Sequence, residues 1–312
     1  MSVIDISHLT KDYGHHRGIF DVSFTVNKGE VFGFLGPNGA GKTTTIRHLM
    51  GFSKPQEGII TVDGKDSWKS AAAIKRDVGY LPGELAFPAS MTGNQFIDFM
   101  AKERQITDMT KTKELLKKFE LDPSGGIKRM SLGTKRKLAI VTAFMHDPAI
   151  LILDEPTSGL DPLMQERFIN FILAEKAAGK TILLSSHIFS EVDATCDRIA
   201  IIKEGEVVST IVADDLRQNK NKAFKLEFSD EDTYQRFVKE TELEITTLRP
   251  EQNQVKIHIQ DENIHEFFKE LSHYSLNFIS EIKFTLEDYF MDFYDRKKSV
   301  EEGNEVLTHG MH

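Results

Sequence analysis

The sequence predicts an α/β protein with a mainly parallel sheet, followed by a small α+β domain. Short apolar runs typical of buried strands alternate with helical patterns over the first two thirds of the chain, and this alternation is typical of parallel sheets covered by helices. The stretch 213–222 is polar and non-periodic, which predicts a linker. Beyond it, strand and helix patterns restart in a different order, which indicates a second domain.

The composition is that of an ordinary globular protein. The chain has 312 residues, of which 40% are hydrophobic and 28% charged, enough for more than one domain. The net charge of −9 argues against a general nucleic-acid binder. The single cysteine, Cys196, fits a reducing compartment. No apolar run approaches the roughly 18 residues of a membrane span, and the N-terminus lacks a signal-peptide pattern, so we expect any membrane role to depend on a partner.

The first elements follow from alternation and apolar runs. Residues 2–9 and 19–26 alternate apolar and polar and predict two antiparallel strands. Residues 30–35 are nearly all apolar, as in a strand buried on both faces. The pattern TTTIRHLMGF then predicts a helix, and IITVDG predicts another strand.

A helical subdomain is expected at about 84–147. Its last helix begins near Ser131, a good N-cap residue. Lys135, Arg136 and Lys137 crowd the first turns, where the helix macrodipole disfavours cations by roughly 0.3–1 kcal/mol each. We therefore expect an anion near the start of this helix.

Two more buried strands, 150–153 and 181–185, enclose a helix that ends near Gly179, a residue typical of a C-cap. The run IAIIKEGEVVS then predicts a hairpin. We expect this first domain to span residues 1–212.

The second domain is expected over 223–298, with a tail at 299–312. Its signals follow the order βαββαβ plus one final helix, which is the split-βαβ arrangement. Such a fold often binds RNA, but the strands FKLEF and QVKIHI lack the basic-aromatic RNP pattern. By fold analogy alone, we expect a regulatory or dimer-supporting module.

The strongest chemical signal is the glycine-rich run GPNGAGKTT. It follows a buried strand and opens a helix, which is the context of a P-loop, and so it predicts a P-loop NTPase core. The glycines let backbone N–H groups point at a β-phosphate. Lys42 supplies charge for the β- and γ-phosphates, and the Thr43 hydroxyl can ligate Mg²⁺. The expected nucleotide contacts are Gly36, Pro37, Asn38, Gly39, Ala40, Gly41, Lys42, Thr43 and Thr44.

An acidic pair ends the apolar strand 150–153, at the sheet edge where open α/β sheets bind ligands. Asp154 is expected to hold Mg²⁺ through water, and Glu155 to orient or activate the attacking water. Alone, such a pair would be an ordinary helix N-cap, but the P-loop favours catalysis. His187 follows another strand and reaches the same edge, where it can contact a γ-phosphate, although a lone histidine is more often structural.

Together these motifs resemble the nucleotide-binding subunit of an ABC transporter over residues 1–212. The P-loop, the run ILILDEP, SGLD at 158–161 and the SSH ending at His187 occur in the order and spacing of that family. SLGTK resembles its LSGGQ signature. The resemblance implies an ATPase that uses ATP and Mg²⁺ and drives a separate transmembrane permease of the exporter type.

The resemblance also implies a composite site. In this family two nucleotide domains pair head to tail, and each ATP lies between one P-loop and the partner's signature helix. Ser131 and Gly133 are then expected to serve the partner's γ-phosphate, which explains the expected anion. Asp161 of the D-loop belongs to the same site, and Tyr13 is expected to stack on adenine. A homodimer or heterodimer of cytoplasmic subunits is implied, held by the permease at the inner face of the cell membrane, with no nucleic acid as partner.

Two features depart from the family. The signature keeps only its serine and second glycine, a variant associated with exporter-type subunits. Gly83 stands where the family has a glutamine that serves Mg²⁺, so either Glu84 replaces it or the metal uses an extra water. The segment 84–100 is expected to contact the permease, although core packing explains some of its apolar residues equally well. Those residues are Phe87, Met91, Phe96 and Phe99.

Two other functions stay open. A soluble ABC ATPase acting on ribosomes or nucleic acid usually carries two nucleotide domains in one chain or long coiled coils, and this sequence shows neither. A P-loop kinase leaves SLGTK and SGLD unexplained. Membrane association of the native protein separates the transporter subunit from both.

Overall fold

The computed structural model describes residues 1–15, 17–217, 221–282 and 285–291. The chain divides into two compact units, Met1–Ala213 and Asp214–His312, and each is described by itself. Part of the expected linker, the end of the expected last helix and the tail at 299–312 lie outside the described residues. Within the described part, no helix is both long and apolar enough to cross a membrane.

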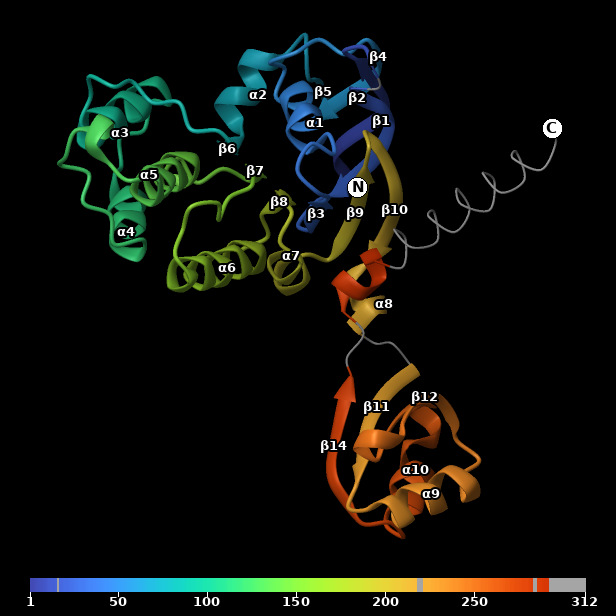
Figure 1. The fold of residues 1–312 in the computed structure, drawn as a ribbon. Helices are drawn as coiled ribbons and strands as arrows, with labels where there is room; N and C mark the ends of the chain where they lie inside the picture. The colour runs from blue at the N-terminus through green and yellow to red at the C-terminus, as the bar shows by residue number, and fades with distance from the viewer. Residues whose placement is uncertain (16, 218–220, 283–284, 292–312) are drawn as a thin grey trace. The chain divides into compact units, whose positions relative to one another are not determined.

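A six-stranded sheet forms the centre of the N-terminal unit (Figure 1). Its strands are β3 (Val31–Leu35), β6 (Gly79–Leu81), β7 (Ile150–Asp154), β8 (Thr181–Ser186), β9 (Arg198–Lys203) and β10 (Glu206–Val212). The spatial order is β10-β9-β3-β8-β7-β6. β10 runs antiparallel to β9, and the other neighbours pair in parallel. This arrangement confirms the expected mainly parallel sheet. β6 was not predicted, because three residues are too few to show a pattern.

A second sheet, fully antiparallel, covers the first. Its order is β2-β1-β4-β5. The bounds are β1 (Ser2–Asp12), β2 (Gly18–Asn27), β4 (Glu57–Val62) and β5 (Lys65–Asp66). The two sheets share one apolar core, in which Phe24 stacks on Phe32 with ring centroids 5.1 Å apart. Ile46, on the helix after the P-loop, is buried in the same core, which fixes that helix against both sheets.

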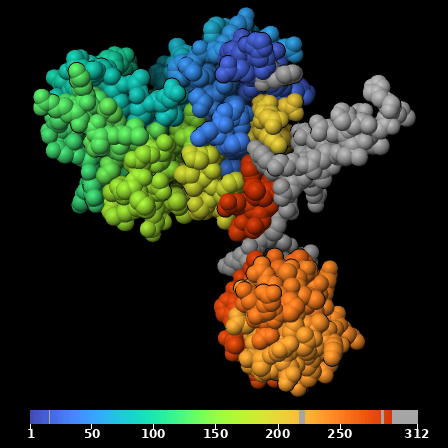
Figure 2. Space-filling model, in the orientation of Figure 1, coloured from blue at the N-terminus to red at the C-terminus, as the bar shows by residue number. Residues whose placement is uncertain are grey.

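The helices of this unit differ in how well the sequence predicted them. They are α1 (Lys42–Leu49), α2 (Ala71–Asp77), α3 (Gly93–Glu103), α4 (Thr110–Lys118), α5 (Leu132–Phe144), α6 (Pro162–Ala177) and α7 (Phe189–Thr195). α3, α4 and α5 form the helical subdomain, which lies apart from α1 and projects as a lobe (Figures 1 and 2). α5 begins after Ser131, whose hydroxyl accepts the Thr134 N–H, so the N-cap prediction is confirmed. The short α2 and α7 were not predicted.

The described part of the C-terminal unit contains a four-stranded antiparallel sheet, and helices α9 and α10 connect its strands. Its elements are β11 (Asn221–Phe228), α9 (Glu231–Glu240), β12 (Glu244–Arg249), β13 (Gln254–Gln260), α10 (Ile264–Leu271) and β14 (Leu276–Ile282). The order β12-β13-β11-β14 confirms the split-βαβ fold. Phe228 and Phe237 pack with centroids 4.7 Å apart in its core. The expected linker is wrong in part, because Ala213–Arg217 forms a short helix, α8.

Candidate functional site

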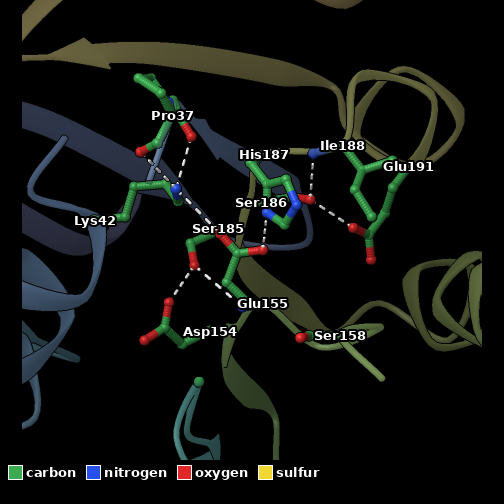
Figure 3. A network of polar contacts seen from close by, with 12 residues as sticks. Pro37, Lys42, Asp154, Glu155, Ser158, Ser185, Ser186, His187, Ile188 and Glu191 are labelled. Atoms are coloured by element: carbon green, nitrogen blue, oxygen red, sulfur yellow. Dashed lines mark hydrogen bonds and ion pairs between the residues drawn. The ribbon is translucent and has the colours of Figure 1, made fainter. Parts of the chain in front are cut away.

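The predicted site residues gather at one edge of the parallel sheet. β3, β8 and β7 are neighbours. The P-loop follows β3, and His187 follows β8. Asp154 is the last residue of β7, and Glu155 comes directly after it. Since parallel strands present their carboxyl ends at one edge, three distant segments meet there. Figure 3 shows their side chains converging.

The P-loop has the close backbone packing that its glycines predict. Gly41, the residue before α1, has φ +111°, a conformation that favours glycine. A Cβ on Gly36 would lie 2.3 Å from the Ile202 carbonyl oxygen, so no side chain fits there. The loop borders a cavity of about 160 Å³. The cavity is lined by Asn38, Gly39, Gly41, Lys42, Thr43, Thr44 and Glu155.

Lys42 is buried and faces a carboxylate. Its Nζ donates to the carbonyl oxygens of Gly36 at 2.6 Å and Pro37 at 3.1 Å. It also lies 3.1 Å from Glu155 Oε1. The lysine is only 5% exposed, and a buried ammonium requires a negative partner. Glu155 supplies that charge here, and a phosphate in the cavity would supply it equally well.

Glu155 links the lysine to the histidine (Figure 3). Its Oε2 lies 2.6 Å from His187 Nδ1. Because a carboxylate only accepts hydrogen bonds, Nδ1 carries the proton in this contact. Glu155 has φ +49°, an uncommon conformation for a residue with a side chain. Its N–H donates to the Ser185 carbonyl at 3.0 Å, which anchors the strained residue to β8.

Asp154 has one satisfied and one free oxygen. Ser185 Oγ donates to Oδ1 at 2.5 Å, whereas the buried Oδ2 has no hydrogen-bond partner in the described part of the chain. An unpaired carboxylate oxygen is the hard ligand that Mg²⁺ prefers. Beside it lies Gly83, where a Cβ would be 2.9 Å from Oδ2. The donor set therefore fits a divalent cation.

Glu84, the expected substitute ligand, points to no partner. Its side chain is exposed, and the described residues provide no ion pair or hydrogen bond for it. Thr43, the other expected ligand from the P-loop, is exposed at the cavity wall. The structure thus brings Thr43 and Asp154 to the site and leaves the role of Glu84 a prediction.

Arg136 corrects the interpretation of the cations on α5. The side chain is 2% exposed and donates to three carbonyl oxygens instead of facing an anion. The acceptors are Pro82 at 2.8 Å, Gly83 at 2.7 Å and Ser158 at 3.0 Å. Arg136 therefore ties α5 to the loops that follow β6 and β7. Lys135 and Lys137 are half-buried, and the expected anion beside them stays a prediction.

The signature residues do not line the phosphate cavity of their own chain. Ser131 caps α5 and is exposed. A Cβ on Gly133 would lie 2.9 Å from the Gly159 carbonyl oxygen, so the signature packs closely on the D-loop. Asp161 caps α6 by accepting the Met164 N–H at 3.0 Å. Both capping residues are exposed.

Tyr13 lies in the loop between β1 and β2 with 58% of its surface exposed. Its N–H donates to the Arg17 carbonyl at 2.8 Å, which holds the loop. Lys11 Nζ lies 5.5 Å from the ring centroid. The ring is therefore accessible, as stacking on a base requires, but it does not line the phosphate cavity.

Sequence reasoning missed Glu191. This α7 residue is 2% exposed, and its Oε2 accepts from Ser186 Oγ at 2.6 Å. Ser186 Oγ in turn accepts the Ile188 N–H at 3.0 Å, so Glu191 braces both neighbours of His187 (Figure 3). Burial raises the pKa of the Glu191 carboxyl to about 7. Its only sequence signal is a carboxylate one turn after His187.

The sequence profile of the ABC transporter family matches residues 19–158. The bacitracin transport ATP-binding protein BcrA of Bacillus licheniformis is 36% identical over 235 residues, covering 74% of this chain and 76% of that protein. The ABC transporter ATP-binding protein NatA of Bacillus subtilis is 39% identical over 198 residues, covering 62% and 80%. A solved ATP-binding subunit of an ABC transporter is 30% identical with a TM-score of 0.63, covering 70% and 92%. A dimeric bacterial ABC transporter cassette, 23% identical with a TM-score of 0.61 and covering 67% and 98%, shares the fold.

Proposed function

Because the chain belongs to the ABC transporter family of ATP-binding proteins, we propose that Lys42, Asp154 and Glu155 form its ATP-hydrolysing centre. The chain is an ATPase subunit of such a transporter. The observation that carries the assignment of residues is the ion pair between Lys42 and Glu155 across the phosphate cavity. In this pair Lys42, the one cation among the described residues that line the cavity, faces the carboxylate that can accept a proton.

Each residue has a defined task when ATP enters. Lys42 exchanges Glu155 for the β- and γ-phosphates, which frees the carboxylate. Glu155 then orients the attacking water and accepts its proton. His187, held through Nδ1, keeps Nε2 available for the γ-phosphate. The loop Gly36–Thr44 binds the phosphates through its N–H groups, and Tyr13 stacks on the base.

Mg²⁺ would be held by Thr43 and Asp154, and Glu84 is the further candidate ligand. When bound, the ion supplies charge stabilisation on the phosphates. The free Oδ2 of Asp154 supports this assignment. Gly83 leaves the space beside that oxygen open, since it has no side chain.

The dimer completes each site. ATP-binding cassettes of this family dimerise and act with transmembrane subunits. We infer that Ser131, Gly133 and Asp161 act on the ATP bound by the partner, since none of them lines the cavity of its own chain. The proposed dimer contains either two copies of this chain or one copy and a second ATPase subunit.

The proposed transport direction is export. Of the relatives, BcrA is named for bacitracin transport and another, LnrL of Bacillus subtilis, for linearmycin resistance. We infer a peripheral subunit at the inner face of the cell membrane, docked on a permease through the segment 84–100. There Phe99 is exposed, whereas Phe87 and Phe96 pack edge to face at 5.0 Å, so Phe99 is the better candidate for the contact.

A mixing experiment tests the composite site. Ser131→Arg should block the partner's site, and Lys42→Ala should disable the chain's own site, so each variant alone should be nearly inactive. In a mixture, heterodimers contain one site with both halves intact, and ATPase activity should return if one competent site suffices. The isolated Ser131→Arg chain should still bind nucleotide. Loss of that binding would place Ser131 in its own chain's site and contradict the proposal.

A further inference from the structure

The outer face of the C-terminal sheet carries an unusual row of residues. The helices cover the face with Phe224, Leu226 and Ile257, so residues that alternate with these point to the opposite face. Lys225 on β11 stands opposite Lys256 on β13. Thr247 on β12 and Ser280 on β14 continue the same row. Two lysine positions therefore lie side by side between two hydroxyl-bearing residues.

The lysine pair is unfavourable for the fold alone. Like charges directly opposite each other on adjacent strands are destabilising. Lys225 and Lys256 are half-buried, yet neither has a carboxylate partner among the described residues. Four other partly or fully buried lysines among the described residues do have carboxylate partners, whereas the half-buried Lys135 and Lys137 of α5 do not. The paired lysines are Lys111 with Glu175, Lys176 with Asp197, Lys180 with Glu175 and Lys222 with Asp261.

The row borders a cavity of about 200 Å³. Arg249, also without a carboxylate partner in the described segments, lines it together with both lysines and Thr247. Gln254 lines it too and is 8% exposed. Its Nε2 donates to Glu227 at 2.7 Å, while its buried Oε1 has no hydrogen-bond partner among the described residues. Three cationic residues and a glutamine with an unpaired buried oxygen thus line one cavity of a chain with net charge −9.

We propose that this cavity is a binding site for a small anionic molecule bearing a phosphate or carboxylate group. Its negative charge offsets the repulsion between Lys225 and Lys256, and the Thr247 hydroxyl and Arg249 contribute further donors. Gln254 Oε1 accepts a hydrogen bond from the same molecule. The site gives the C-terminal unit a ligand of its own, separate from the nucleotide that the N-terminal unit binds.

Inorganic phosphate is a suitable probe for the full-length chain saturated with Mg²⁺ and ADP. Isothermal titration should compare the wild type with Lys225→Gln/Lys256→Gln and with the control Lys239→Gln/Lys269→Gln. The control changes the net charge equally at two exposed helix positions of the same unit. Any phosphate bound in the nucleotide cavity is common to all three proteins, so the difference between them reports the new site.

The wild type and the control should bind one more phosphate than the lysine-pair variant, or bind it about tenfold more tightly. Without phosphate, Lys225→Gln and Lys256→Gln as single variants should each unfold at a higher temperature than the wild type, because each relieves the repulsion. Phosphate should raise the wild-type unfolding temperature more than theirs. Equal phosphate binding by all three proteins, or a lower unfolding temperature in both single variants, would overturn the proposal.

Discussion

Replacing Arg136 with Met should destabilise the N-terminal unit strongly. The methionine fills much of the same space but removes the three charge-assisted hydrogen bonds to Pro82, Gly83 and Ser158. Hydrogen bonds to charged groups contribute roughly 1.5–3 kcal/mol each, which bounds the loss at about 9 kcal/mol. The bonds share one side chain and water can enter the space, so the terms do not add. We expect a loss of about 3–5 kcal/mol in the free energy of unfolding.

Urea unfolding followed by tryptophan fluorescence reports the stability of the N-terminal unit. Trp68 is the only tryptophan of the chain and lies in the N-terminal unit. Lys137→Met is the matched control, because this half-buried lysine lies on the same helix and forms no ion pair in the described part of the chain. The control should change the free energy by less than about 0.5 kcal/mol.

ATPase activity should also fall in Arg136→Met, including under conditions in which the variant is folded. Arg136 holds the Gly83 carbonyl, and Gly83 lies against Asp154 Oδ2, so the loop that borders the proposed metal site loses its anchor. A destabilisation below about 1 kcal/mol would refute the reasoning, because the buried carbonyls would then have found other partners.

Three further predictions concern groups around the site. Glu191 holds a proton in the native state up to about pH 7, whereas the unfolded carboxyl loses it near pH 4.5, so this group lowers stability as pH rises between those values. The unfolding temperature of Glu191→Gln should therefore rise relative to that of the wild type as the pH increases from 5 to 8. A difference that stays constant with pH would contradict the raised pKa. Gly83→Ala should lower ATPase activity by displacing Asp154, whereas Gly125→Ala, where a Cβ meets nothing within 4 Å, should not; equal activity would show that Asp154 adapts. Glu84→Ala should raise the Mg²⁺ concentration needed for half-maximal hydrolysis, and an unchanged titration would assign that position to water.

The sheet edge could be predicted because strand, loop and helix patterns are local. The P-loop is recognisable from nine consecutive residues, and the apolar runs before Asp154 and His187 place both residues at the carboxyl ends of strands. These segments are expected to meet because the carboxyl ends of parallel strands lie at one edge of the sheet. The split-βαβ order of the C-terminal unit followed from the sequence for the same reason.

The features that the sequence did not predict depend on contacts between distant segments. Arg136 has the sequence context of a surface cation, and only the packing of two loops against α5 makes it a buried donor. Glu191 lies in a seven-residue helix too short for periodicity. The Lys225–Lys256 pair depends on strand register, which no local pattern specifies.

The assignment of Glu155 is tested most directly by ATP turnover and ATP binding in Glu155→Gln. The amide cannot accept the proton of the attacking water, but Lys42 and the P-loop are untouched. We predict that the variant binds ATP at least as well as the wild type, since removing the charge opposite Lys42 favours the phosphates. Hydrolysis should be nearly abolished, and gel filtration with ATP should show a trapped dimer. Hydrolysis close to the wild-type rate would contradict the account.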